Sequence, residues 1–523
     1  LLIFKPTKPD RSQASQKHDL SGFLLRKGNI MRKTFLALIS LLIISTLLIT
    51  GCGGSARDQE LQAIIEKEGL TGDPSLERDL PNISEPLPQL GMMLFYTKAL
   101  SAAQDAACVS CHHPSLGGGD AIPMSIGVDA DVPELLGPGR THVSGPLVPR
   151  NAPTTFNSGM WDAFMFHDGR VESKGKTTGA NGADGYGIRT PDRPWGYPDP
   201  DAGANLVVAQ ARFPVTAEDE MRGFDFGTGH GNTLEVRDET TRELLAAILG
   251  DYGYGEGVLE QNEWLPEFQK AYNSDADAET LVIFENIVHA IGEYERSQVF
   301  VDTPWRAYVQ GDNDAISESA KRGAILFYTS DEEGGANCSV CHAGDFFTDE
   351  DFHVIAIPQI GRGKASGTYG DDDFGRYLET QDPDDKYAFR TPTLLNVEVT
   401  GPYGHDGAYE SLEMVVRHKM DVVTALNNYD FSILPPDIRT HNAKGYTQAA
   451  LEQLQENRRD DITTIEDLFL SDQDVEDIVN FLLTLTDPCT KDRNCLAPWI
   501  PDETTPNPDG LQLEAVDEDG NPL

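Results

Sequence analysis

Positive charge and long apolar runs are what this 523-residue sequence has least of. It holds 41 Lys and Arg against 85 Asp and Glu, for a formal net charge of −44. Such a chain repels polyanions, which excludes nucleic-acid binding by phosphate neutralisation and disfavours an anionic membrane surface, whereas a basic protein partner is attracted. Hydrophobic residues make up 39% and charged residues 24%, which excludes global disorder and a multi-span membrane protein.

The most apolar segment lies near the beginning of the chain and is too short to span a bilayer. It runs from Phe35 to Ile49, follows Met31 and two basic residues, and ends at Cys52. This order is typical of a lipoprotein signal peptide, in which the Cys thiol is acylated. We therefore expect an exported protein that faces the periplasm and is held to the membrane only by lipid on Cys52. Because Gly53 is not a retention-type Asp, the outer membrane is favoured.

Cysteine is scarce, with seven residues, but four of them form two Cys-x-x-Cys-His motifs, Cys108–His112 and Cys338–His342. This spacing is the attachment signature of c-type haem, because two thiols one turn apart add to the vinyl groups of one porphyrin and the adjacent imidazole ligates its iron. The sequence therefore predicts two covalently bound haem c groups. The predicted attachment residues are Cys108, Cys111, Cys338 and Cys341, and the predicted axial ligands are His112 and His342.

Two other kinds of site use Cys-x-x-Cys pairs. A four-cysteine zinc site does not need the trailing His of each motif, and the two pairs are far apart in the sequence. A thioredoxin-like redox pair needs a βαβ context. The repeated motif in an exported chain favours haem over both. Cys489 and Cys495 flank a short polar segment with no nearby His, which predicts a local disulfide rather than a third metal site.

The pattern around the motifs indicates a repeated helical module. Apolar helical segments precede both motifs, and amphipathic helices are expected over 280–300 and over 471–485, the latter with Ser471 and Asp472 as N-cap candidates. Gly- and Pro-rich stretches predict long loops at 175–204 and 223–232, and the acidic tail after Pro501 is expected to be mobile.

The predicted fold class is mainly α, with two cytochrome c-like domains that each bind one covalent haem, interrupted by long loop insertions. The expected segments are an upstream mis-start (1–30), the signal peptide (31–51), a linker (52–83), an N-terminal haem domain (84–310), a C-terminal haem domain (311–488), and a disulfide loop with an acidic tail (489–523).

With these motifs the chain resembles the bacterial diheme cytochrome c peroxidases and their MauG-type relatives. The resemblance also rests on the segments 150–154, 168–170, 210–214 with Glu220 and Met221, 390–393, and 402–407. It implies that the N-terminal haem reacts with H2O2 and that the C-terminal haem relays electrons. It further implies that Glu220 is the acid/base, with Gln210 as its hydrogen-bonding neighbour.

The chain departs from the family pattern at three places. Sixteen residues after His112, where some members carry a distal His, stands Val128, which predicts a five-coordinate N-terminal haem. His167 replaces the Trp before Asp-Gly-Arg that is thought to pass electrons between the haems, and Trp161 is a candidate substitute. The third place is the sixth ligand of the C-terminal haem. The family position, fourteen residues after the His of its Pro-Tyr-x-His-Asp-Gly segment, falls here on Lys419; His418 and Met420 are equally favoured and Lys419 ranks behind them.

The resemblance also implies a Ca²⁺ ion, with oxygen ligands carried over to Asn151, Thr400 and Pro402. The leading functional hypothesis is a peroxidase that reduces H2O2 to water with electrons from a small cytochrome c or cupredoxin. The alternative is a MauG-type oxidase that uses peroxide to oxidise Tyr or Trp side chains of a partner protein. A third is an electron-transfer cytochrome without peroxide chemistry.

Overall fold

A computed structural model of the chain describes residues 55–224 and 238–523. The predicted signal peptide, the lipidation site Cys52 and most of the Gly-rich loop at 223–232 lie outside the described residues. From Ala56 to Leu523 the chain forms one structural unit. Within the described ranges, no helix combines the length and the apolar character needed to cross a bilayer.

Helices dominate the part of the chain that surrounds the first motif. The α-helices of this part are α2 (Ala56–Glu68), α3 (Pro86–Tyr96), α4 (Leu206–Ala211), α5 (Asp238–Gly250), α6 (Trp264–Tyr272), α7 (Ala278–Leu281), α8 (Phe284–Arg296) and α9 (Pro304–Val309). The first motif begins with a 3₁₀ turn, η2 (Cys108–Ser110), and a π-helical turn, η6 (Glu218–Arg222), follows α4.

The part that surrounds the second motif is built in the same way. The α-helices in this half of the sequence are α10 (Glu318–Tyr328), α11 (Tyr377–Thr380), α12 (Leu412–Met420), α13 (Val422–Asn427), α14 (Ala443–Arg459), α15 (Asp472–Leu483) and α16 (Arg493–Leu496), of which α16 packs on the first module. The second motif begins with the 3₁₀ turn η9 (Cys338–Val340). As predicted, Ser471 caps α15: its hydroxyl accepts from the backbone N–H of Asp474 and its own N–H donates to the Asp474 carboxylate.

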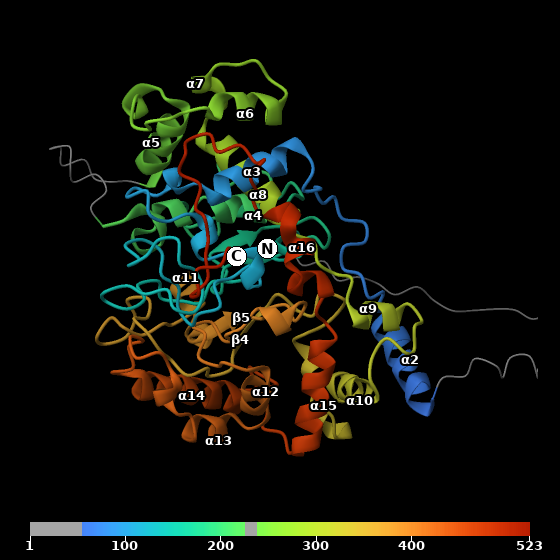
Figure 1. Cartoon of the computed structure of the whole chain (residues 1–523). Helices are drawn as coiled ribbons and strands as arrows, with labels where there is room; N and C mark the ends of the chain where they lie inside the picture. Colours follow the sequence, from blue (N-terminus) through green and yellow to red (C-terminus); the bar gives the residue numbers. More distant parts are fainter. Residues whose placement is uncertain (1–54, 225–237) are drawn as a thin grey trace, which may run out of the picture. The chain divides into compact units, whose positions relative to one another are not determined.

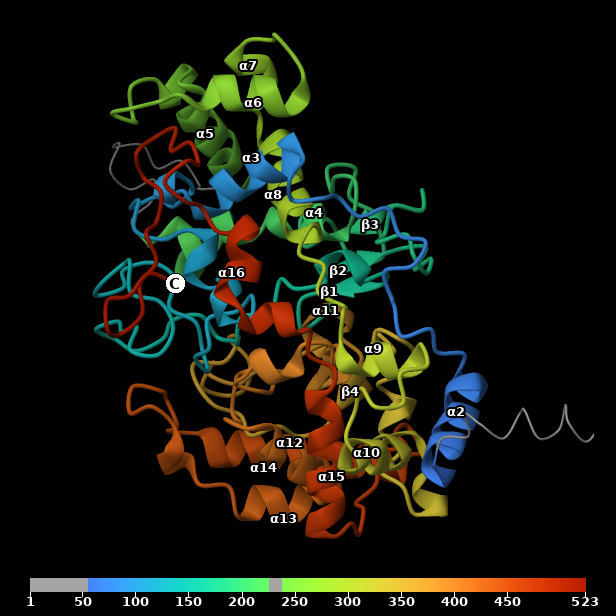
Figure 2. The same ribbon diagram turned by 45° about the vertical axis from the view of Figure 1, so that its right-hand side comes forward.

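Each motif is preceded by a helix that crosses a later helix at very short range. In the first part α3 crosses α8, and in the second α10 crosses α15 (Figures 1 and 2). A Cβ at Gly91 would lie 1.9 Å from the carbonyl oxygen of Ala290, and a Cβ at Gly323 would lie 1.9 Å from that of Asp477. Only glycine allows these crossings, and their equivalence supports a repeated module.

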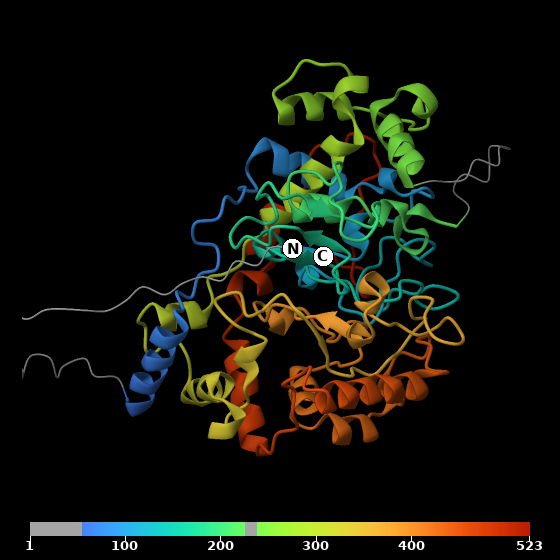
Figure 3. The ribbon, with the colours of Figure 1, turned by 180° about the vertical axis from the view of Figure 1, so that it is seen from behind.

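Two small antiparallel sheets complete the fold. One contains β1 (Phe164–Met165), β2 (Val171–Ser173) and β3 (Ile188–Arg189), and the other pairs β4 (Phe352–Val354) with β5 (Ala388–Arg390). In the second sheet His353 lies opposite Phe389. A small core joins β4 to α13 and α14, which lie together in Figures 1 and 3.

The main hydrophobic cores do not follow the expected domain boundary. One core contains residues of α3, α6 and α8. The other joins Met160, Trp161 and Leu206 to Phe327 on α10 and Phe481 on α15. Segments from the first half of the sequence therefore share a core with the helices of the second module. This shared core packs the two modules against each other.

Two segments differ from what the sequence led us to expect. Part of the expected linker forms α2, which is bound to α10 by a buried ion pair of 2.7 Å between Asp58 and Lys321. The tail after Pro501 packs on the first module: Asp509 accepts hydrogen bonds from Trp264 Nε1 (2.9 Å) and Thr97 Oγ1 (2.6 Å). These buried acceptors and donors fix a segment whose acidic composition suggested mobility.

Candidate functional site

A cavity of about 440 Å³ is lined by both Cys-x-x-Cys-His motifs. Its wall includes Cys108, Cys111, His112, Cys338, Cys341 and His342. All four cysteines are free thiols, whereas Cys489 and Cys495 form a disulfide in the loop where the sequence predicted one. Within the described ranges no ligand cluster joins cysteines of the two motifs, so the four-cysteine zinc site is not formed.

The first motif presents one histidine to the cavity. The Nδ1–H of His112 donates to the carbonyl oxygen of Gly118 at 3.2 Å, and burial lowers the pKa of the ring, so it is neutral with Nε2 left for a ligand. The adjacent His113 is buried away from the cavity, where its Nδ1 accepts from the Ser115 backbone N–H at 3.1 Å. The structure thus separates the roles of two consecutive histidines.

The second motif repeats this geometry. The Nδ1–H of His342 donates to the carbonyl oxygen of Phe347 at 3.0 Å, and burial lowers the pKa of His342 to about 4. A neutral imidazole whose Nδ1 is fixed by a backbone carbonyl is oriented to bind a metal through Nε2. Both predicted axial histidines therefore line the cavity, each with Nδ1 at hydrogen-bond distance from a backbone carbonyl oxygen.

The predicted acid/base and its neighbour both line the cavity. Glu220 comes from the π-helical turn η6, and Gln210 comes from α4. Burial and the neighbouring Asp219 raise the pKa of Glu220 above its ordinary value. A Cβ at Gly127 would lie 2.2 Å from the Glu220 carbonyl oxygen, so this glycine lets η6 approach the loop that carries Val128. Val128 itself is buried and is not part of the cavity wall.

Helix α12 brings only part of the predicted ligand set to the cavity. The residues that line it follow a helical face, namely Leu412, Val415, Val416, Lys419 and Met420. His418 points the other way: its Nδ1 accepts from the Tyr409 hydroxyl and its Nε2–H donates to the Ile355 carbonyl oxygen, each at 2.7 Å. The structure therefore does not place His418 at the second haem site, because one residue along a helix turns the side chain by about 100°.

A buried charge network lies in the wall between the motifs. Arg150 binds Asp168 at 2.6 Å and Asp373 at 2.7 Å. Although burial opposes it, these two carboxylates raise the pKa of Arg150. Beside this network His405 stacks on Phe389 with ring centroids 3.7 Å apart. The wall is therefore both rigid and permanently charged.

Comparisons with known proteins agree with this geometry. Residues 85–314 match the family model described as di-haem cytochrome c peroxidase. The methylamine utilization protein MauG of Methylorubrum extorquens is 28% identical over 329 residues, which cover 63% of this chain and 67% of that protein. The chain is a cytochrome c peroxidase-like oxidoreductase that is similar to the di-haem cytochrome c peroxidases and to MauG.

Other proteins to which the chain is similar include peroxidases. The cytochrome c551 peroxidase of Pseudomonas aeruginosa is 27% identical over 334 residues, covering 64% of this chain and 71% of the relative. Among solved structures, the diheme peroxidase BthA from Burkholderia thailandensis has a TM-score of 0.48 and 18% identity, covering 85% of this chain and 93% of that one.

The donor set in the cavity fits the cofactor that the family implies. Each motif offers two free thiols and one oriented imidazole at the wall of a cavity whose lining is largely apolar, as a porphyrin requires. Arg390 also lines the cavity, and its Nη1 is buried without a hydrogen-bond partner. Such an orphaned guanidinium group suits a haem carboxylate.

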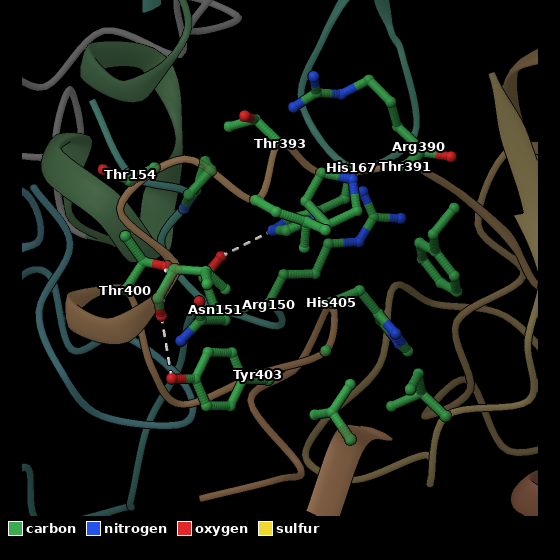
Figure 4. Close-up of a pocket in the computed structure, with 18 of the residues that line it drawn as sticks. Arg150, Asn151, Thr154, His167, Arg390, Thr391, Thr393, Thr400, Tyr403 and His405 are labelled. Atoms are coloured by element: carbon green, nitrogen blue, oxygen red, sulfur yellow. Dashed lines mark hydrogen bonds between the residues drawn. The ribbon is translucent and has the colours of Figure 1, made fainter. Parts of the chain in front are cut away.

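The residues predicted to lie between the haems are brought together. Trp161 and His167 both line the cavity. The Nε2–H of His167 donates to the Asn151 carbonyl oxygen at 3.1 Å, as Figure 4 shows, and burial lowers the pKa of this His to about 4. Trp161 lies under the guanidinium group of Arg390.

The residues predicted for calcium also share one region of the wall. Asn151, Thr400 and Pro402 all line the cavity, and Figure 4 shows the first two on the same side of it. The Asn151 amide donates to the carbonyl oxygens of Ile122 (2.9 Å) and Pro123 (3.2 Å), which leaves its own oxygen to face a cation.

Three residues of the site carried no signal in the sequence. Asp373 and Lys364 come from a loop, and only the fold brings them to Arg150 and Asp168. Glu295, on α8, lines the cavity near Cys108 and lay within a helix expected only to pack. The only sequence feature that could have pointed to Glu295 is its position on the apolar face of the helix, one helical turn after Ile291.

Proposed function

We propose that this protein reduces hydrogen peroxide to water, H2O2 + 2H⁺ + 2e⁻ → 2H2O, at its N-terminal haem site. Bound haem c would supply a redox-active iron at each motif, one for peroxide and one for electron relay. The observation that carries the proposal is that Glu220, Gln210 and His112 line one cavity. A peroxidatic site needs an oriented proximal imidazole and an acid/base group facing the same space.

Glu220 would move the proton that cleavage of the O–O bond requires. Its carboxylate would accept a proton from one peroxide oxygen and return it to the other, so that water leaves. The raised pKa suits this exchange, because a group that both takes and gives a proton works best with a pKa near the working pH. Gln210 would hold peroxide or water by hydrogen bonds from its amide.

We propose that electrons enter at the second motif from a small, basic cytochrome c or cupredoxin. Val340, between the two cysteines of that motif, is 51% exposed and also lines the cavity, so the haem edge there would lie near the surface. Asp331, Glu332 and Glu333 form an exposed acidic rim on the preceding turn. A basic donor would be steered to this rim, and salt would slow its association.

A MauG-type oxidation of Tyr or Trp side chains on a partner protein is the second candidate. It is favoured by Val128, which is apolar and outside the cavity wall, so that this position leaves the N-terminal iron open without prior reduction. For either candidate function we also propose a Ca²⁺ ion bound at Asn151, Thr400 and Pro402. We likewise propose that the protein is exported and carries a lipid anchor on Cys52.

Peroxide titration of the resting protein tests the two candidates. The peroxidase predicts steady consumption of H2O2 when reduced basic cytochrome c is present, with two electrons used per peroxide. The side-chain oxidase predicts a long-lived oxidised state when peroxide is added without a donor, and cross-linked or oxidised residues on a partner. A pyridine haemochrome assay that returned fewer than two covalent haems per chain would contradict both.

A further inference from the structure

The cavity contains a second carboxyl group near the first motif that the proposed chemistry does not use. Glu295 lies on the last turn of α8 and lines the cavity together with Ile291, one turn earlier. Among the described residues none donates a hydrogen bond to its carboxyl group or forms an ion pair with it. Leaving a carboxyl group unpaired in an apolar cavity is costly, so the position calls for an explanation.

The repeated module shows that this position does not need a carboxyl group for packing. Ala290 of α8 and Asp477 of α15 occupy equivalent positions, because each places its carbonyl oxygen against the glycine of the crossing helix. One residue further along, both helices present isoleucine to the cavity, Ile291 and Ile478. Five residues beyond the crossing, the same face presents Glu295 in α8 and Leu482 in α15. The second module fills the equivalent place with an apolar side chain.

Neighbouring charges do not neutralise Glu295. Arg296 is engaged with Glu293 at 2.5 Å, and Asn205 also donates to Glu293. At the other end of α8, Arg242 is bound to Asp192 at 2.6 Å. On this helix, therefore, Glu293 outside the cavity is paired and Glu295 inside it is not.

The titratable groups that face Glu295 are acidic or neutral. The charge of Glu295 acts on Tyr294 on α8 and on Cys108 in η2; Tyr96 on α3 is hydrogen-bonded to Tyr294, and Glu220 on η6 lines the same cavity. Haem attachment removes the Cys108 thiol from titration, and both tyrosines have pKa values raised by burial. Burial raises the pKa of Glu295 to about 8 with no opposing cation.

We propose that Glu295 is the proton-holding group of the N-terminal haem, which takes up one proton when that haem is reduced and releases it when the haem is oxidised. The electron comes from the redox donor of the proposed function, and the only bond made or broken is the O–H bond of the carboxyl group. An electron added to the site disfavours a nearby buried carboxylate, and proton uptake restores the charge balance. Leu482 cannot do this at the second haem.

The proposal rests on the proposed function in one respect, namely that haem is attached at Cys108 and Cys111. It predicts that the midpoint potential of the N-terminal haem falls as pH rises through the range around about 8 where Glu295 titrates. The slope approaches about 59 mV per pH unit, which is the value for a tenfold change in a one-electron couple.

Optically monitored redox titration of the diheme protein at a series of pH values tests this. Glu295→Gln keeps the shape of the side chain and should abolish the slope, as should Glu295→Leu, which copies the second module. Glu293→Gln, on the same helix, and Glu220→Gln should keep it. Three results would overturn the proposal. The slope could persist in Glu295→Gln, it could be absent from the unmodified protein, or it could be lost in Glu220→Gln instead.

The same preparations separate this inference from the proposed function. A protein with two covalent haems that shows the slope but does not turn over peroxide would contradict only the proposed function. A protein that turns over peroxide with a pH-independent potential would contradict only the role of Glu295. If Glu295→Leu does not fold, Glu295→Gln decides the outcome, because it differs only in its ability to ionise.

Discussion

The guanidinium carbon of Arg390 lies 3.3 Å from the centre of the Trp161 ring, and both side chains line the cavity between the two motifs. A cation over the face of an indole is attracted to the neutral ring. The same cation opposes removal of an electron from that ring. Trp161 is therefore placed between the haem sites but is electrostatically unsuited to carry positive charge between them.

Replacement of Trp161 by Phe should change the rate of electron transfer between the haems by less than about threefold, because the positive charge of Arg390 opposes oxidation of the indole beneath it. Stopped-flow reduction of the C-terminal haem, followed by observation of the N-terminal haem, measures this rate. Arg390→Gln in the same experiment serves as the comparison, since it removes the charge and keeps the indole. A tenfold loss in Trp161→Phe would mean that the indole carries electrons despite its cation.

The orientation of α12 makes a prediction about the C-terminal haem. His418→Gln should leave the resting spectrum of this haem unchanged, because both ring nitrogens are engaged by Tyr409 and Ile355 outside the cavity. A change of spin state is expected instead from Lys419→Ala or from Met420→Ala, since both side chains line the cavity. Low-temperature EPR and optical spectra decide between them.

A high-spin C-terminal haem in His418→Gln would show that α12 turns when haem binds. Loss of the two hydrogen bonds should still lower the free energy of unfolding of His418→Gln by about 1–3 kcal/mol, so a stability measurement confirms that the substitution acts where the structure places it.

Elements with strong local signals could be predicted from the sequence, and those set by long-range contacts could not. The capped helix expected over 471–485 is present as α15. The helix expected over 280–300 is divided into α7 and α8, because Asp277 caps a separate short helix through the Thr280 backbone N–H. The apolar periodicity continues through the break, so the sequence pattern alone did not reveal it.

The same division applies to the site. Both haem motifs and each of the family segments contribute residues to the cavity wall. Glu295 was not predicted, since a single acid in an amphipathic helix looks like any other until the crossing partner is known. Asp373 was not predicted either, because its role depends on Arg150, which lies more than two hundred positions earlier in the chain.

The C-terminal tail should contribute to the stability of the N-terminal module. Asp509 is 5% exposed and accepts from both Trp264 and Thr97. Asp509→Ala leaves two buried donors unpaired, so we expect a loss of about 2–4 kcal/mol in the free energy of unfolding. Denaturant titration monitored by Trp fluorescence measures it. Glu514→Ala, at an exposed position of the same tail, is the control; equal effects of the two substitutions would mean that the tail does not hold the module through Asp509.

Docking of a basic donor should depend on the acidic rim beside Val340. Glu332→Lys combined with Glu333→Lys should raise the KM for a basic cytochrome c about tenfold at low ionic strength, with little change in kcat, because rim charges act mainly on association. Added salt should reduce the difference. Glu452→Lys, exposed on α14, is the matched control. A loss of rate with all three substitutions would indicate a general charge effect instead of a docking surface.

Substitution of Glu220 should separate proton transfer from binding. Glu220→Gln should lower kcat for peroxide by about 10²–10⁴-fold, the usual contribution of a positioned acid/base, and leave the proximal His112 unaffected. Because the pKa of Glu220 is raised and its carboxylate is the form that accepts a proton, the activity of the unmodified protein should fall as pH drops through a value above that of an ordinary glutamate. Glu218→Gln, exposed on the same turn, should keep both the rate and this pH profile. An unchanged acid limb in Glu220→Gln would assign the proton transfer to another residue.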